Sequence, residues 1–287
     1  MNMMHKVSLG VTLVLSLLIS VDLEAKQGVQ FAGIAFVGGK ADSEATMPYI
    51  TTALAGSGLL MANQKLLAAV SQINREDIVF LTGGEGAASV NSGGALATAL
   101  AISAESFRDN RTSIENTMKL SIRAQILTFD FTNKRIISAF PVYSATVKIY
   151  DDTTDMEALR LELVMKTLIA NEEDPGKSVF DKAAEKLQSL TFKEGWNVNL
   201  QVRTITINPA AAVILAANAI PERAYKRWFA ASFSSAISDF HDIPVLPYTQ
   251  GQAVNAMRLR FDEGNDISFS LPPPDFVVDL VARGFAT

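Results

Sequence analysis

The chain has 287 residues, of which 48% are hydrophobic, with no cysteine and a formal net charge of −5 at pH 7. The lack of cysteine excludes disulfide bonds, thiolate zinc sites and a cysteine nucleophile, so a packed core must stabilise the fold. The mild acidity offers no basic face or stripe for nucleic acid, and no nucleic-acid partner is expected.

Residues 1–25 have the three parts of a secretory signal peptide. Lys6 supplies a positive charge, residues 7–21 (VSLGVTLVLSLLISV) are uncharged and mostly apolar, and Ala25 is a suitable small residue at a cleavage point. The apolar run is shorter than the ~20 residues that a spanning helix needs. We therefore expect cleavage after Ala25 and a periplasmic protein with no direct membrane span. The alternative is an inner-membrane anchor formed by an uncleaved signal.

The first part of the remaining chain mixes apolar and helical segments. Residues 29–37 (VQFAGIAFV) are an apolar run ended by two glycines, which is typical of a mostly buried strand. Pro48 stands where the first turn of a helix tolerates proline. The elements expected here are a strand over 29–37, a polar link over 40–46, a helix that starts near Pro48, breaks at Gly56 and Gly58 and resumes over 59–73, a strand over 77–81, and an alanine-rich helix over 95–107.

The clearest β signal lies between residues 118 and 150. Every second residue from Leu120 to Ile126 is apolar, which is the period of a half-buried antiparallel strand. The elements expected here are this strand, a turn over 132–134, a partner strand over 135–143, and two amphipathic helices over 157–171 and 179–190.

The last third of the chain returns to alternation before it becomes helical. The expected elements are a strand over 197–207, helices over 210–217 and 221–240, and strands over 256–261, 267–271 and 276–282, the first two joined by a hairpin turn. Together the patterns predict an α+β fold with mixed or antiparallel sheets, a long β-hairpin and packed helices. We expect a signal peptide over 1–25, an α/β domain over 26–192 and a second α+β region over 193–287.

The order of elements in the first region resembles a known type of envelope domain. A strand ending in IAFVGG, a helix near Pro48, a second short strand and a long hairpin followed by a helix pair are similar to TolB N-terminal and curli-secretion-lipoprotein domains. The resemblance covers residues 29–190 and implies a periplasmic assembly or secretion accessory whose sheet and loops bind other proteins. The curli pore proteins carry lipid on a cysteine, which this chain does not have, so the resemblance does not extend to the pore-forming role.

A glycine-rich segment, Gly83, Gly84, Glu85 and Gly86, follows the strand expected over 77–81. Glycine-rich loops of this kind can cradle phosphate groups at the start of a helix. The segment does not have the Gly-Lys-Ser/Thr ending or the spacing of a nucleotide-binding loop, and Glu85 would repel an anion. We interpret it as a surface loop that contacts a partner.

His241 is the one histidine that remains after loss of the signal peptide. A serine triad would have to combine it with a nearby serine (Ser232, Ser234 or Ser235) and a nearby acid (Asp239 or Asp242). None of these serines lies in a Gly-x-Ser-x-Gly motif. We expect His241 to end a helix, where the helix dipole favours it, and keep it as a weak catalytic candidate. A histidine-based metal site is not expected.

Four aromatic residues follow helical spacing just before His241: Tyr225, Trp228, Phe229 and Phe233. Such a stripe indicates core packing, and the alternative is an exposed face that binds a partner.

The sequence therefore favours a non-enzymatic exported protein that binds other proteins or envelope polymers during envelope assembly or transport. No cofactor is expected. The alternative is an exported hydrolase or small-ligand-binding protein whose site no motif reveals.

Overall fold

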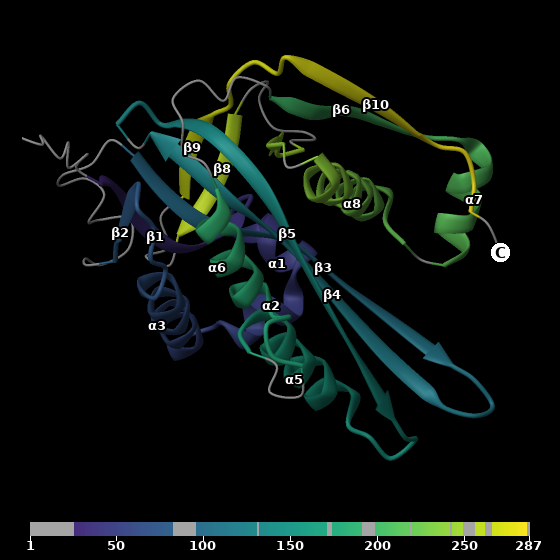
Figure 1. Ribbon diagram of the computed structural model, residues 1–287. Coiled ribbons are helices and arrows are strands. Elements are labelled where there is room, and N and C mark those ends of the chain that lie inside the picture. The colour runs from purple at the N-terminus through teal and green to yellow at the C-terminus, as the bar shows by residue number, and fades with distance from the viewer. Residues whose placement is uncertain are drawn as a thin grey trace, which may run out of the picture.

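A computed structural model describes residues 26–82, 96–130, 132–170, 174–190, 199–218, 220–241, 243–248, 256–261 and 266–285 (Figure 1). The predicted signal peptide and the Gly83–Gly86 segment lie outside these residues. Within them, no helix is both long and apolar enough to cross a membrane. The fold is α+β, as predicted.

The elements follow in chain order. They are β1 (Gln27–Val37), α1 (Lys40–Thr46), α2 (Pro48–Ala53), α3 (Ser57–Ser71), β2 (Ile78–Leu81), β3 (Leu96–Arg111), β4 (Asn116–Asp130), β5 (Arg135–Tyr150), α5 (Met156–Leu168), α6 (Val179–Ser189), β6 (Leu200–Ile207), α7 (Pro209–Ala217), α8 (Glu222–His241), β7 (Val245–Leu246), β8 (Ala256–Phe261), β9 (Asp266–Ser270) and β10 (Phe276–Ala282).

Two sheets organise these elements. The larger is mixed, with seven strands in the order β2-β1-β3-β4-β5-β9-β8, and β8 also pairs with β1. The sheet therefore closes on itself at one end. The smaller sheet is parallel, in the order β10-β6-β7. β8 and β9 form the antiparallel pair that the sequence predicted, but they belong to the larger sheet. The predicted division at residues 192 and 193 stays a prediction.

Helices cover the outer face of the larger sheet. α2, α3, α5 and α6 lie on this side in Figure 1 and bury the main hydrophobic core against it. Alternate residues of β4 point into this core, among them Leu120, Ile122 and Ile126, as the period-two pattern predicted. Asp155 caps the start of α5 by accepting two backbone N–H bonds, and Ser178 and Asp181 form a capping box at the start of α6. The predicted helix pair is thus confirmed.

The inner face forms a second core where the sheet closes. Ala97, Ala99 and Ala101 of β3 point into it, and Phe129, Phe261 and Phe269 fill it. The prediction of an alanine-rich helix over 95–107 is therefore wrong, because this segment lies within β3. Alanine favours helices in isolation, but at these positions small side chains are what the narrow closed interior admits. The alternation of alanine with Thr98, Leu100 and Ile102 was the missed strand signal.

Residues 40–46 also differ from expectation, because they form the short helix α1 instead of a polar link. Ser43 is buried, and its hydroxyl donates to the carbonyl oxygens of Gly39 and Lys40. Asp42 accepts ion pairs from α8, at 2.8 Å from Arg223 and 3.8 Å from Arg227. Polar residues therefore form a helix here because hydrogen bonds within the helix and ion pairs with α8 use their polar groups.

A bulge in β1 depends on one glycine. Gly33 has a φ of +80°, and a Cβ atom there would lie 2.7 Å from Oδ1 of Asn63. The same oxygen accepts the backbone N–H of Ile34 at 2.8 Å. Only glycine combines this backbone conformation with so close an approach, so Gly33 fixes how β1 packs on α3.

Glu105 of β3 joins the larger sheet to α2. Its carboxylate accepts the backbone N–H groups of Tyr49 at 3.0 Å and of Ile50 at 2.8 Å, which begin the helix. Burial raises the pKa of Glu105 to about 7, and the two N–H bonds offset part of that rise. Glu105 thus binds a proton in the folded protein at a pH where the unfolded chain has released it.

Glu105 should make the stability of the protein depend on pH. Between pH 4.5 and about 7 the folded state holds the proton that the unfolded state loses, so this contribution to stability is lost as pH rises through that window. The full effect is about 3 kcal/mol. Urea unfolding at a series of pH values should show a flatter profile for Glu105→Gln than for the wild type. The exposed Glu115→Gln variant serves as control, and equal slopes for all three proteins would contradict the prediction.

Candidate functional site

A cleft of about 370 Å³ lies between the edge of β5 and one face of α6. Its floor on β5 is formed by Pro141, Val142 and Tyr143. Its wall on α6 is formed by Lys182, Glu185, Lys186 and Ser189, which stand at positions i, i+3, i+4 and i+7 and so share one helix face. The volume is within the usual range for small-ligand sites, ~300–1,000 Å³.

Two lysines, Lys182 and Lys186, line the cleft and contact aromatic residues of β5. The ammonium group of Lys182 donates to the backbone carbonyl of Tyr143 at 2.9 Å and lies 5.9 Å from the centre of its ring. The ammonium group of Lys186 lies 5.2 Å from the centre of the Phe140 ring. Within the described ranges β5 pairs with β9 at Arg135 alone, so Lys182 reaches a carbonyl on a strand edge. A ring face attracts a cation at such distances.

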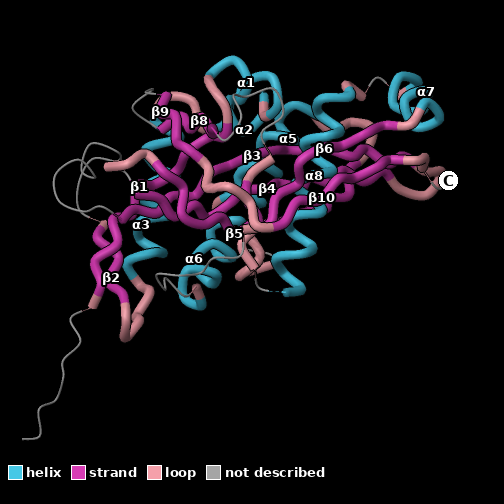
Figure 2. The backbone as a smooth tube through the Cα atoms, turned by 90° about the horizontal axis from the view of Figure 1, so that it is seen from above, coloured by secondary structure: helices cyan, strands magenta, loops and turns pink. Residues whose placement is uncertain are grey.

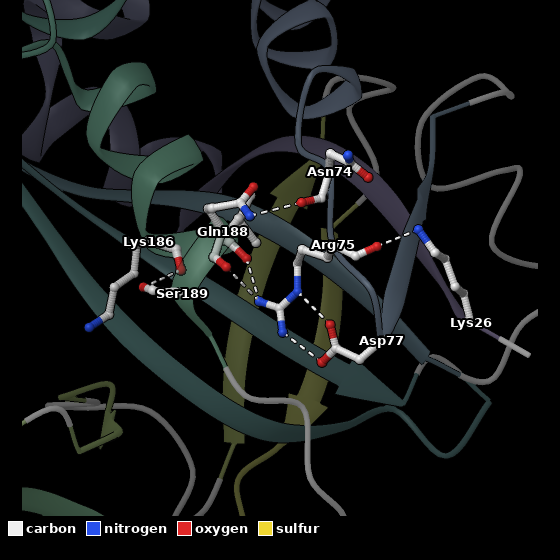
Figure 3. A network of polar contacts seen from close by, with 8 residues as sticks. Lys26, Asn74, Arg75, Asp77, Lys186, Gln188 and Ser189 are labelled. Atoms are coloured by element: carbon white, nitrogen blue, oxygen red, sulfur yellow. Dashed lines mark hydrogen bonds and ion pairs between the residues drawn. The ribbon is translucent and has the colours of Figure 1, made fainter. Parts of the chain in front are cut away.

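A polar network holds the end of α6 and therefore the wall of the cleft (Figure 3). Arg75 donates to the carbonyl oxygens of Leu187 at 2.9 Å and Gln188 at 3.0 Å, and its guanidinium also pairs with Asp77 at 2.7 Å. Gln188 in turn donates to the backbone of Asn74. The last carbonyls of a helix have no partners within the helix, and a cation there also suits the helix dipole.

Arg123 of β4 carries a buried charge next to the cleft. Its guanidinium donates to Ser232 at 2.6 Å and lies 4.9 Å from the ring centre of Tyr143 and 5.3 Å from that of Trp228. The residue is 7% exposed, and desolvation lowers the pKa of this guanidinium. Among the described residues, its Nε has no hydrogen-bond partner and no carboxylate lies within 4 Å of the group. Arg123 thus ties α8 to the larger sheet with no counterion from this part of the chain.

The aromatic stripe of α8 contributes to the contact with Arg123 and to a small core beneath the second sheet. Phe229 and Phe233 pack on the core formed by Val202, Ile205 and Ala230. Trp228 stays partly exposed beside Arg123. Core packing is therefore confirmed for part of the stripe.

A second candidate surface is the edge strand β10. In Figure 1, β6 and β10 run above α8, and Figure 2 places them with α7 at the end of the molecule far from β2. In the described part of the chain β10 pairs with β6 alone, so its other side presents backbone N–H and C=O groups. Its side chains are apolar yet exposed: Phe276 by 58%, Val277 by 43% and Val281 by 50%.

One charged residue stands in the middle of β10. Arg203 donates through Nε to Asp279 at 3.1 Å, and Thr204 donates to the same oxygen at 2.6 Å. These bonds hold the pKa of Asp279 at about 2. A bulge at Arg203 in β6 lets both Val202 and Ile205 point into the core. Asp279 therefore lies on the outer side of the strand, between Val277 and Val281.

The structure places His241 at the end of α8, as expected, where it is exposed and its ring meets that of Phe240 at 4.8 Å. The candidate serines lie elsewhere: Ser232 is bonded to Arg123 and to the carbonyl of Trp228, and Ser234 and Ser235 are buried. A triad stays untested, because Asp242 lies outside the described residues. In the described ranges no group of three His, Asp or Glu side chains could hold a metal ion.

Neither candidate surface was predicted from the sequence. The helical spacing of residues 182, 185, 186 and 189 is visible there, but not the strand that faces it. The alternation in residues 276–282 predicted a strand, but not that it would form a sheet edge.

No protein-family model and no curated protein matches the chain. Among solved structures, a minor lipoprotein from Acinetobacter baumannii is similar over 57% of this chain and 89% of its own, with 11% sequence identity and a TM-score of 0.29. A likeness of this size does not establish a family, and the resemblance to TolB and curli-secretion domains stays a prediction.

Replacing Arg75 should weaken the fold at the end of α6. Arg75→Ala removes the donors to the carbonyl oxygens of Leu187 and Gln188. Because the Arg75 side chain is mostly buried, water replaces these donors incompletely, and we expect a loss of about 2 kcal/mol in the free energy of unfolding. Arg111→Ala is a matched control, because Arg111 also pairs with an aspartate two residues away but its side chain is 62% exposed, against 9% for Arg75. Urea unfolding of both variants tests this, and equal losses would contradict it.

Proposed function

We propose that this protein is an exported, non-enzymatic accessory of the cell envelope that binds another protein during assembly or transport. Export is supported by the signal-peptide features of residues 1–25. The observation that carries the binding role is the exposed edge of β10, with Phe276, Val277 and Val281 in water.

Strand addition is the mode of binding that suits this edge. An extended segment of a partner can pair with the backbone groups that β10 presents, and its side chains can cover the exposed valines. Soluble proteins normally protect long apolar edges, because these edges otherwise aggregate. β10 has one charge along seven residues, and that charge is already paired with Arg203.

The occupant that we propose is a segment of a different protein, not a second copy of this chain. Asp279 is the central residue of β10. Two copies that paired antiparallel along the whole strand would place one Asp279 opposite the other, and like charges directly opposite destabilise a strand pair. The partner segment should therefore be apolar, with a neutral polar or basic residue opposite Asp279.

Site-specific photo-crosslinking in the intact envelope tests this proposal. A photoreactive residue at Val277 should give a discrete adduct with another polypeptide, and one at Leu60, which is exposed on α3, should not. Val281→Lys adds a charge that disfavours pairing at the edge, so it should abolish the adduct. Val147→Lys, at an exposed valine of β5, should leave the adduct unchanged.

The proposal fails on any of three outcomes. These are equal yields at positions 277 and 60, an adduct with twice the mass of the chain, or an adduct that persists in the Val281→Lys variant. Circular dichroism and the thermal midpoint of each variant establish that it is folded.

A further inference from the structure

The helix α7 is apolar on the side that faces away from the protein as well as on the side that packs against it. On the inner side, Ala211 and Leu215 are buried. The outward side carries an exposed apolar stripe at positions i, i+3, i+4 and i+7, formed by Ala210, Val213, Ile214 and Ala217. Val213 is 69% exposed and Ile214 is 37% exposed. A helix that is apolar all round is normally buried, so the outward stripe indicates a surface that apolar material covers.

The segment around α7 is uncharged and stands at one end of the molecule. Residues 204–221 contain no acidic or basic side chain. Figures 1 and 2 both place α7 past the ends of β6 and β10, so the helix forms a tip of the molecule. At the start of the helix, the backbone N–H of Asn208 donates to the carbonyl oxygen of Ala282 at 3.0 Å. This bond brings Arg283, which is exposed and has no ion pair among the described residues, next to the beginning of α7.

We propose that α7 inserts its outward stripe into the lipid–water interface of an anionic membrane, with Arg283 at the level of the headgroups. The helix has nine residues and is therefore about 14 Å long. This is less than half of the ~30 Å hydrocarbon core, so α7 lies along the interface and does not cross the membrane. The proposal goes beyond strand addition at β10 and rests on other side chains.

The attachment of α7 to the protein explains its uniform apolar character. In an isolated interfacial helix, the face opposite the lipid is polar because it meets water. In α7 that face packs against the protein through Ala211 and Leu215, so it is apolar as well.

A lipid surface suits the stripe better than a protein does. A stable interface between two proteins takes about 20–30 residues from each side and has a polar rim with hydrogen bonds. The stripe has four residues, two of them alanine, and no polar side chain. A second copy of α7 would add only the same small area. Insertion into a bilayer requires no partner of matching shape, and Arg283 complements anionic headgroups.

A single fluorescent probe tests the insertion. The chain has no cysteine, so Val213→Cys provides one unique position for a thiol-reactive dye that senses polarity. In the exported protein, vesicles of phosphatidylethanolamine and phosphatidylglycerol should shift the emission of this dye to the blue, and a quencher carried on the acyl chains should reduce it. The matched control is Leu60→Cys on α3, at a leucine that is 61% exposed, where the dye should not respond.

Co-sedimentation with the same vesicles gives the size of the effect. Val213→Glu should bind about tenfold more weakly, because it replaces an apolar contact with a charge that the anionic surface repels. Leu60→Glu, the matched control, should bind as the wild type does. Arg283→Gln should bind these vesicles about fivefold more weakly, as expected for loss of one cation near an anionic surface.

The proposal is overturned if vesicles shift the emission at neither position, or at both positions equally. It is also overturned if Val213→Glu and Leu60→Glu bind equally well. A shift at position 213 that needs no lipid and grows with protein concentration would contradict it too, because a second copy would then cover the stripe. Equal binding of Arg283→Gln and the wild type would overturn the role of Arg283. The dye is attached at an exposed position, so the test stays decisive if Val213→Glu does not fold.

Discussion

The larger sheet has two apolar faces, and the need to remove both from water governs the rest of the structure. β4, near its centre, contributes Ile122 to the core under the helices and Phe129 to the core where the sheet closes. Four helices cover the outer face, and the pairing of β8 with β1 covers one end of the inner face. The cleft lies where this coverage stops, along the free part of β5, and the other candidate surface is the edge of the second sheet.

The rest of the inner face is covered in a different way. Here β4 presents Arg123 and Gln125, so α8 cannot attach by apolar contacts alone. It attaches through Arg123, Trp228 and Ser232, and through the ion pairs of Asp42 with Arg223 and Arg227. Because α8 supports the smaller sheet, these contacts also determine where the edge of β10 stands. Polar contacts of this kind specify one docking geometry more strongly than they add to stability.

The two candidate surfaces differ in chemistry and in position. The edge of β10 offers backbone groups and exposed valines, which suit an extended apolar segment of a protein. The cleft offers two lysines that lie beside aromatic rings. The first depends on α8 and the second on α6, whose end Arg75 holds. Each can therefore be altered by substitution without disturbing the other.

Local patterns in the sequence determined most elements: the strand at 29–37, the alternation of β4, and the helix pair of α5 and α6. They did so because periodicity and capping act over a few residues. Tertiary structure alone decided that the alanine-rich segment within 95–107 is a strand, because only the closed sheet requires small side chains there. It also decided that Lys182 faces Tyr143 and that β10 is an edge. Such juxtapositions join residues far apart in the chain, and no local pattern records them.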